Sequence, residues 1–381
     1  MTPRLPGRSG GVAEPAETLA RTGAPALERT EPSSDGLEAA TATRRHARIA
    51  LLGASGYAGQ EFVRLALGHP GLELVALLSR EHAGRAVSAV LPGLDSRVRA
   101  LPPFADPIEL GGLAAAGTFD TLVSCLPHGA LRERLEGVPG LANPALRIVD
   151  LSADFRDQSA GFRYGLPEAF RDSLPGANRI ANPGCYPTAA ALALLPALER
   201  GWVGDPVMIS ALSGVSGAGR SPALRTSFVE LEGGASVYRA GIEHHHVGEM
   251  SRNFGRLAGA PRAVGFTPQL APMARGILLT ATAPLTRAVS SLEAREAYLE
   301  RYQREPFVQV LESGAWPETR SVRASNRCDV AVTTLHDGRT LLATAALDNL
   351  VKGAAGQAIQ NLNLVLGWPE DWALPRHGSP W

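Results

Sequence analysis

The chain has 381 residues, of which 45% are apolar and 19% charged, a composition typical of a globular protein with two or three domains. Its 37 basic and 37 acidic residues cancel, so neither nucleic acid nor an anionic membrane is expected as a partner, because both attract a basic surface. The apolar runs fall short of the ~20 residues that a membrane span needs, and three cysteines do not make a disulfide framework. We therefore expect a soluble, cytoplasmic protein.

Residues 1–45 are predicted to form a disordered tail. They are rich in Ala, Pro, Gly, Thr, Ser, Glu and Arg, and they contain neither aromatic residues nor an apolar period, so folding could not repay their ordering entropy. The segment lacks the apolar stretch of a secretory signal, and its glutamates are unlike an organellar transit peptide.

From Arg48 onward, short apolar strands alternate with helical stretches. Strands are expected at residues 48–52, 72–79, 121–125 and 147–151, with a helix that ends near Leu67 after the first of them. This alternation predicts βαβ units and a parallel sheet. We therefore assign residues 46–186 to a Rossmann-type dinucleotide-binding domain of α/β class.

Beyond about residue 187 the pattern changes to that of an α+β domain with a mostly antiparallel sheet, assigned to residues 187–348. Asp337-Gly338 is a hairpin signal within it. A last helix is expected in the segment 349–367, which we assign back to the first domain. The expected elements are helices at 188–200, 291–304 and 351–366 and strands at 207–212, 264–267, 277–283, 307–311, 330–335 and 341–347.

A glycine-rich loop, residues 53–59, lies between the first predicted strand and its helix. The free N–H groups and the positive dipole end of a helix N-terminus favour a bound phosphate there. Gly53 is expected to make the tight turn, Gly56 to let a pyrophosphate approach, and Gly59 to let the helix pack on the strand. The spacing G-x-x-G-x-x-G departs from the usual G-x-G-x-x-G, so a purely structural turn is the alternative.

Ser79 and Arg80 end the second predicted strand, where NAD-binding domains usually carry Asp or Glu for the ribose 2′-hydroxyl. A hydroxyl and a guanidinium suit a 2′-phosphate instead, so NADP(H) is favoured over NAD(H). The alternative is a solvated charged turn.

Cys185 follows Asn182-Pro183-Gly184 and directly precedes a predicted helix of small apolar residues. A helix N-terminus is expected to lower the pKa of the thiol, and the thiolate is the nucleophile needed for acyl transfer. A buried packing cysteine is the alternative, and it is the interpretation that we give to Cys125 and Cys328.

With these motifs, the chain resembles the N-acetyl-gamma-glutamyl-phosphate reductase family of arginine biosynthesis. The resemblance implies NADPH-dependent reduction of N-acetyl-gamma-glutamyl phosphate to N-acetyl-L-glutamate 5-semialdehyde and phosphate, through a Cys thioester. It also implies a homo-oligomer, a dimer or tetramer, built on the antiparallel sheet. The matching segments, in order, are residues 53–59, 124–129, 150–156, 164–168, 182–188, 213–220, 266–268, 272–276 and 352–358.

The resemblance assigns roles residue by residue. Cys185 matches the nucleophile, and the motif His-x-His-x-Pro-Glu-Ile falls on residues 244–250, which implies His244 as the acid/base and His246 beside the substrate. Gly248 and Met250 depart from the motif, and the triple histidine leaves the register open by one residue. In an extended segment His244 and His246 would share a face. No metal is expected, since hydride chemistry needs no Lewis acid.

Arginines are expected to face the carboxylate and phosphate of the substrate, and Arg156 and Arg220 are the candidates, with a structural ion pair or solvent exposure as the alternative. Asn349 is expected to hydrogen-bond the nicotinamide carboxamide. The predicted cofactor-binding residues are Gly53, Ser55, Gly56, Tyr57, Gly59, Ser79, Arg80, Ser216, Gly217 and Asn349.

Other functions on the same scaffold remain open: reduction of an aminoadipyl phosphate in lysine synthesis, aspartate-semialdehyde dehydrogenase activity, or a silent NADP-binding sensor. One methylene of substrate length is worth only ~1–3 kcal/mol of discrimination. The segments 150–156 and 164–168 favour the acetylglutamyl substrate, and Cys185 with the histidines argues against a sensor.

Lys352 is the one lysine among 37 basic residues, so arginine is the ordinary cation of this chain. We predict that Lys352 occupies a narrow slot near the cofactor, between backbone carbonyls or near a phosphate, where the planar fork of an arginine would clash. The alternative is chance.

Overall fold

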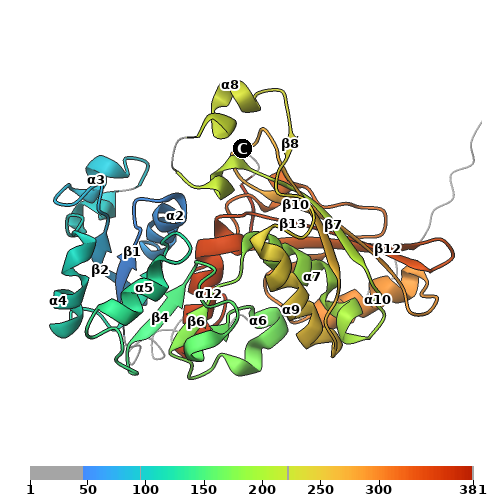
Figure 1. Cartoon of the computed structure of the whole chain (residues 1–381), viewed down its shortest axis with the longest axis horizontal. Coiled ribbons are helices and arrows are strands. Elements are labelled where there is room, and N and C mark those ends of the chain that lie inside the picture. Colours follow the sequence, from blue (N-terminus) through green and yellow to red (C-terminus); the bar gives the residue numbers. More distant parts are fainter. Residues whose placement is uncertain (1–45, 95, 221–222, 380–381) are drawn as a thin grey trace, which may run out of the picture. The chain divides into compact units, whose positions relative to one another are not determined.

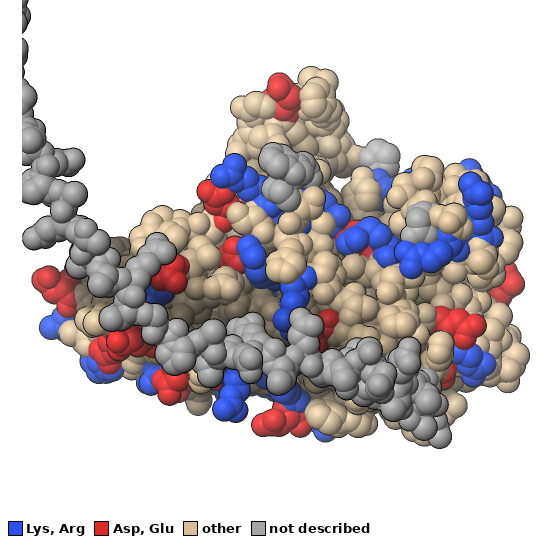
Figure 2. Space-filling model, turned by 180° about the vertical axis from the view of Figure 1, so that it is seen from behind, with Lys and Arg blue, Asp and Glu red and all other residues tan. Residues whose placement is uncertain are grey.

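The structure is a computed structural model that describes residues 46–94, 96–220 and 223–379, so the predicted tail lies outside the described residues. Two sheets organise this part of the chain (Figure 1), one of six strands and one of seven. Among the described residues, no helix is both long and apolar enough to cross a membrane. Acidic and basic side chains are interspersed on the face that Figure 2 shows, as the zero net charge leads one to expect.

The six-stranded sheet is parallel throughout, in the order β2-β1-β3-β4-β6-β5. Strand β1, between β2 and β3, is buried continuously from Ile49 to Leu52, because an inner parallel strand is covered on both faces. The predicted strands are confirmed, whereas β5 and β6, two and three residues long, were not predicted. The strands are β1 (Ala47–Leu52), β2 (Leu72–Leu78), β3 (Thr121–Ser124), β4 (Arg147–Asp150), β5 (Arg163–Tyr164) and β6 (Arg179–Ala181).

Short helices connect these strands, and only the first of them was predicted. They are α2 (Tyr57–Ala66), α3 (Val87–Val90), α4 (Leu110–Ala115), α5 (Ala130–Gly137), α6 (Pro167–Phe170) and the 3₁₀ turns η1 (Ser96–Ala100), η2 (Pro107–Glu109), η3 (Ser159–Gly161) and η4 (Arg171–Ser173).

The seven-stranded sheet has the order β11-β12-β13-β10-β7-β9-β8. Four of its neighbouring pairs are antiparallel, which confirms the expected character, but β7 with β9 and β11 with β12 are parallel, so the sheet is mixed. The hairpin at Asp337-Gly338 is confirmed between β12 and β13, with positive φ at both residues. The strands are β7 (Val207–Ser213), β8 (Ser236–Val237), β9 (Val264–Leu270), β10 (Ile277–Pro284), β11 (Val308–Val310), β12 (Cys328–Leu335) and β13 (Thr340–Leu347).

Helix α7 (Cys185–Glu199) is the central helix of this half, because nearly every side chain from Tyr186 to Leu198 is buried. It packs against β10, β13, α9 and α10 (Figure 1). The neighbouring elements are α8 (Phe228–Leu231), α9 (His245–Ala258), α10 (Ser291–Tyr302), α11 (Thr319–Val322) and the 3₁₀ turns η5 (Val215–Ala218) and η6 (Leu224–Thr226).

The C-terminal segment returns to the parallel sheet. Ile359 and Leu362 of α12 (Gly356–Val365) join the apolar core that contains Ile49 and Val149 of that sheet. One continuous α-helix was expected here, but the segment begins with a π-helical turn, η7 (Val351–Ala355). Asp348 caps this turn, because its carboxylate accepts the N–H groups of both Leu350 and Val351.

Candidate active site

The glycine loop has the geometry of a phosphate-binding turn. Gly53 has a φ of +73°, and a Cβ on it would lie 2.7 Å from the Cys125 carbonyl oxygen. A Cβ on Gly59 would lie 2.4 Å from the Gly53 oxygen, so both positions require glycine. A Cβ on Gly56 would meet only the Gly53 oxygen, at 3.4 Å. Gly56 begins α2 without any side-chain cap, which leaves the helix N-terminus open to an anion.

Two serines join the glycine loop to the end of β2. The Ser55 and Ser79 hydroxyls lie 2.9 Å apart, and Ser79 is buried whereas the next residue, Arg80, is exposed. The structure thus brings the hydroxyl predicted to read a 2′-phosphate next to the loop predicted to hold the pyrophosphate.

A pocket of about 490 Å³ opens beside this loop, between Tyr57 and residues of the second half of the chain. Asn349 underlies it: its Nδ2 donates to the Ser216 hydroxyl over 3.0 Å, and its Oδ1 accepts the Gly276 N–H over 2.7 Å. The pocket is lined by Tyr57, Val215, Ser216, Gly219, Arg220, Ala223, Thr226, Ser227, Ala274, Arg275 and Leu350.

Two arginines line this pocket. Arg220, predicted to face the substrate, donates to the Ser55 carbonyl oxygen of the glycine loop over 2.9 Å. Arg275, assigned no role from the sequence, pairs with Glu61 of α2 and with Asp348, each at 3.0 Å. Arg275 therefore ties the first helix of the parallel sheet to the end of β13.

Cys185 is the first residue of α7 and is half-buried. Burial raises the pKa of its thiol to about 11, although the positive charge of Arg156 opposes that rise. The expectation of a lowered pKa is therefore wrong, since desolvation outweighs the nearby cation. Burial also raises the pKa of the other two thiols, that of Cys125 to about 12 and that of Cys328 further. Such high pKa values suit packing residues.

A buried ion pair lies beside the Cys185 loop. Arg156 Nη1 is 3.0 Å from Glu249 Oε2, and both side chains are almost closed to solvent. The other carboxylate oxygen, Oε1, accepts the Tyr164 hydroxyl at 2.7 Å and the Gly184 N–H at 2.9 Å. Arg156 therefore forms a structural ion pair, which was the sequence-based alternative to substrate binding. The pair places the positive charge of Arg156 next to the Cys185 loop.

Glu249 was not singled out from the sequence as a site residue. Its signal was the spacing of three residues from His246, which places both on one face of a helix. This spacing is informative only if residues 244–250 are helical, and in an extended segment it places the two residues on opposite faces.

The histidine segment is helical, so the extended reading is wrong. His244 is the N-cap of α9, and its Nδ1 accepts the His246 N–H over 3.2 Å. The apolar residues Val247, Met250 and Phe254 follow at helical spacing and are buried, which explains the helix. The burial pattern is nevertheless the predicted one, because His244 and His246 are buried and His245 is exposed.

All three rings are neutral near pH 7. Burial lowers the pKa of His244 to about 4 and that of His246 far below its usual value, and partial desolvation with the neighbouring histidines lowers that of His245 to about 3. Because Nδ1 of His244 accepts a hydrogen bond, the neutral ring carries its proton on Nε2 and can donate it to an oxygen.

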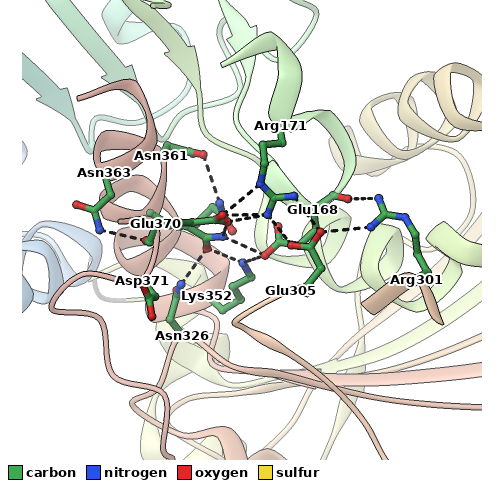
Figure 3. A network of polar contacts seen from close by, with 12 residues as sticks. Glu168, Arg171, Arg301, Glu305, Asn326, Lys352, Asn361, Asn363, Glu370 and Asp371 are labelled. Atoms are coloured by element: carbon green, nitrogen blue, oxygen red, sulfur yellow. Dashed lines mark hydrogen bonds and ion pairs between the residues drawn. The ribbon is translucent and has the colours of Figure 1, made fainter. Parts of the chain in front are cut away.

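Lys352 lies in η7, directly before Gly353, the residue that packs against Cys185. Its Nζ is 2.6 Å from Glu168 Oε1 and 2.7 Å from Gln360 Oε1, in the network that Figure 3 shows. Lys352 is fully buried, but its partners are a carboxylate and an amide side chain and not the predicted backbone carbonyls or phosphate; that an arginine would clash there stays a prediction. Its predicted neighbour was the cofactor, but Lys352 does not line the pocket described above.

Two sequence families match the described halves of the chain. Residues 48–177 match the NAD-binding domain of semialdehyde dehydrogenases, and residues 185–349 match the dimerisation domain of semialdehyde dehydrogenases. The first match shows that the parallel sheet belongs to a nucleotide-binding domain.

Curated relatives are similar over almost their full length. The chain is 41% identical over 350 residues to the N-acetyl-gamma-glutamyl-phosphate reductase of Magnetococcus marinus, covering 87% of this chain and 97% of the relative. It is 43% identical over 361 residues to the protein of the same name from Thermus thermophilus, covering 87% and 99%.

Solved structures show the same fold at much lower identity. Aspartate semialdehyde dehydrogenase II of Vibrio cholerae superposes with a TM-score of 0.66 at 16% identity, over 85% of this chain and 99% of that one. The enzyme of Candida albicans, solved with NADP, superposes with a TM-score of 0.64 at 14% identity, over 84% and 99%.

Proposed function

Because the chain belongs to the semialdehyde dehydrogenase family, and within it to the N-acetyl-gamma-glutamyl-phosphate reductases, we propose that it reduces N-acetyl-gamma-glutamyl phosphate to N-acetyl-L-glutamate 5-semialdehyde in arginine biosynthesis. The observation that carries this proposal is the identity of about 40% over 87% of the chain, together with Cys185 at the start of α7 beside neutral histidines.

The cofactor is NADP(H) in this proposal. The residues of the site fit it: the uncapped start of α2 and the space above Gly56 suit a pyrophosphate, and Ser79 with Arg80 suits a 2′-phosphate. Asn349 holds the floor of the pocket through Ser216 and Gly276, and Arg220 adds positive charge to its wall. When bound, the cofactor supplies the hydride.

Cys185 begins the reaction in this proposal. Its sulfur forms a bond to the acyl carbon of the substrate, the bond from that carbon to the phosphate oxygen breaks, and the thiol proton leaves with hydrogen phosphate. The product of this step is a thioester on Cys185. Since burial holds the thiol protonated, Arg156 is the group that favours the thiolate when the acyl phosphate is in place.

His244 stabilises the oxygen of the substrate in this proposal. Its Nε2–H donates to the oxyanion while the thioester forms and again after hydride has reached the same carbon. The carbon–sulfur bond then breaks, the aldehyde leaves, and the Cys185 thiolate regains a proton from solvent. His246, fixed between Tyr186 and the Gly184 backbone, shapes the substrate side of the site.

We also propose a domain organisation and an oligomeric state for the chain. Residues 46–186 with 349–367 form the nucleotide-binding domain, and residues 187–348 form the catalytic and dimerisation domain of a homo-oligomer, a dimer or tetramer, that works in the cytoplasm on a small acyl phosphate. The match of residues 185–349 to a dimerisation domain supports the oligomer.

The test is phosphate-dependent reduction of NADP⁺ with a panel of semialdehydes. We expect N-acetyl-glutamate 5-semialdehyde to give a higher kcat/KM than aspartate semialdehyde and the aminoadipate semialdehyde that is one methylene longer, by ~10-fold or more for a single methylene. Preference for either of the other aldehydes, or turnover without phosphate, would overturn the assignment.

A further inference from the structure

Four imidazole rings gather at the start of α9. Their ring centroids are 4.5 Å apart for His244 and His245, 4.1 Å for His245 and His246, and 4.9 Å for His244 and His246. His128, from the turn before α5, stands 4.9 Å from His245. The reaction proposed above uses His244 and His246 but leaves His245 without a role.

In the described part of the chain, one buried nitrogen of this cluster has no hydrogen-bond partner. His246 is 6% exposed, and its Nδ1 has no hydrogen-bond partner among the described residues. The nearest carboxylate on α9, Glu249, is taken up by Arg156, Tyr164 and Gly184. Neutral imidazoles with free lone pairs are ligands for a divalent cation of borderline softness.

We propose that His244, His245 and His246 bind one divalent cation of the Zn²⁺ class at the mouth of the active site. One ring nitrogen from each residue lies within 4.8 Å of the others. Nitrogens bound tetrahedrally to one Zn²⁺ at ~2.1 Å are ~3.4 Å apart, so the rings need to turn inward by ~1 Å. His245 is exposed and can make that movement.

The other neighbours define the site further. His244 would give up the cap bond from the His246 N–H, since a neutral ring has one lone pair; that bond is long, at 3.2 Å, and a cap is worth only ~1 kcal/mol. His128 is not assigned as a ligand, because its Nδ1 accepts the Ala153 N–H over 2.9 Å. Three protein ligands leave a position open for water or substrate.

This cation is not a cofactor of the hydride transfer. It would occupy the lone pairs of His244 and His246, so bound Zn²⁺ would inhibit turnover by competing with the acyl phosphate. The binding itself stands without the proposed function, whereas the inhibition rests on it.

The direct test is calorimetric titration of the full chain with ZnCl₂, with CoCl₂ as an optical probe in parallel. We expect one equivalent to bind and the cobalt spectrum to be that of a tetrahedral site. His245→Asn should weaken the affinity by ~10–100-fold or more, the loss known for even indirect partners of a metal. The matched control is His336→Asn, an exposed histidine of the β12–β13 turn.

Activity separates this proposal from the function. Without metal, His245→Asn should keep the kcat/KM of the wild type, and it should resist inhibition by Zn²⁺. Binding of one equivalent without inhibition would overturn the inhibitory role and leave the site. Absence of saturable binding, or equal affinity in wild type and His245→Asn when thermal midpoints show both folded, would overturn the site itself.

Discussion

The ammonium of Lys352 and the carboxylate of Glu168 form an ion pair of 2.6 Å with both side chains fully closed to solvent (Figure 3). Gln360 supports both members, because its Oε1 accepts from Lys352 and its Nε2 donates to Glu168. The residue after Lys352 is Gly353, and a Cβ there would lie 2.7 Å from Cys185 Cβ. The pair therefore anchors the π-helical turn that packs against Cys185.

Lys352→Arg should lower both the thermal midpoint and kcat. A guanidinium is larger than an ammonium and cannot meet Glu168 and Gln360 from the same point, and disturbing one partner of a buried pair costs ~3–5 kcal/mol. Thermal unfolding and steady-state kinetics measure the two effects. The control is Arg295→Lys, because Arg295 forms an ion pair with the exposed Glu312. This substitution should leave the thermal midpoint and kcat nearly unchanged. Wild-type values for Lys352→Arg would refute the slot.

Gly353→Ala should slow the chemical step more than it weakens cofactor binding. The new methyl group would press on Cys185 but not on the pocket beside the glycine loop. We expect kcat to fall and the KM for NADPH to stay near its wild-type value. Gly112→Ala, where a Cβ meets nothing within 4 Å, is the matched control and should keep its activity. A rise in the KM for NADPH alone would contradict this placement of the turn.

Arg80→Ala should raise the KM for NADPH and leave that for NADH nearly unchanged. The reason is that Arg80 is exposed beside Ser79, at the end of β2, where only the 2′-phosphate distinguishes the two cofactors. Steady-state kinetics with NADPH and with NADH measure the two KM values. Equal increases in the KM for both cofactors would mean that Arg80 has a structural role.

His244→Asn should reduce kcat by ~10²–10⁴, the range for a group that stabilises or transfers charge in the transition state. His245→Asn should cost little, because His245 is exposed and lies outside the proposed reaction path. The two variants measured side by side also settle the register of the triple histidine. A severe loss at His245 with a mild one at His244 would shift the assignment by one residue.

Stability should fall as the pH drops below about 6.5. The pKa values of His244 and His245 are lowered to about 4 and about 3 in the folded protein, so between those values and their usual pKa the unfolded chain binds more protons than the folded one. The contribution of the two histidines to the free energy of unfolding is complete above pH ~6.5 and is lost as the pH falls towards ~4. Thermal midpoints between pH 7 and 4 should drop less steeply in His244→Asn. The same pH dependence of the thermal midpoint in His244→Asn and in the wild type would contradict the lowered pKa of His244.

The two sheets could be predicted because their strands are apolar runs bounded by clear turns. The glycine loop and the Cys185 helix could be predicted for the same local reason. The short strands β5 and β6 could not, since two or three residues carry no period. The helical start of α9 was missed because its cap is a histidine, which is not among the usual N-cap residues.

The electrostatics of the site depend on distant residues and so escaped prediction. Cys185 stands at a helix N-terminus, as expected, but the side chains that bury it decide its pKa. Arg156 was expected at the substrate, yet its partner is Glu249, a residue 93 positions further along the chain. Such pairs are set by tertiary packing, which spacing along the sequence does not contain.

The central claim is that Cys185 carries the acyl group, and the turnover of Cys185→Ser tests it most directly. The substitution is to be compared with Cys125→Ser, a buried thiol outside the proposed chemistry. We predict that Cys185→Ser still binds NADPH but no longer oxidises it with N-acetyl-gamma-glutamyl phosphate, because a hydroxyl is far less readily ionised than a thiol, while Cys125→Ser remains active. Appreciable turnover by Cys185→Ser would contradict the thioester mechanism.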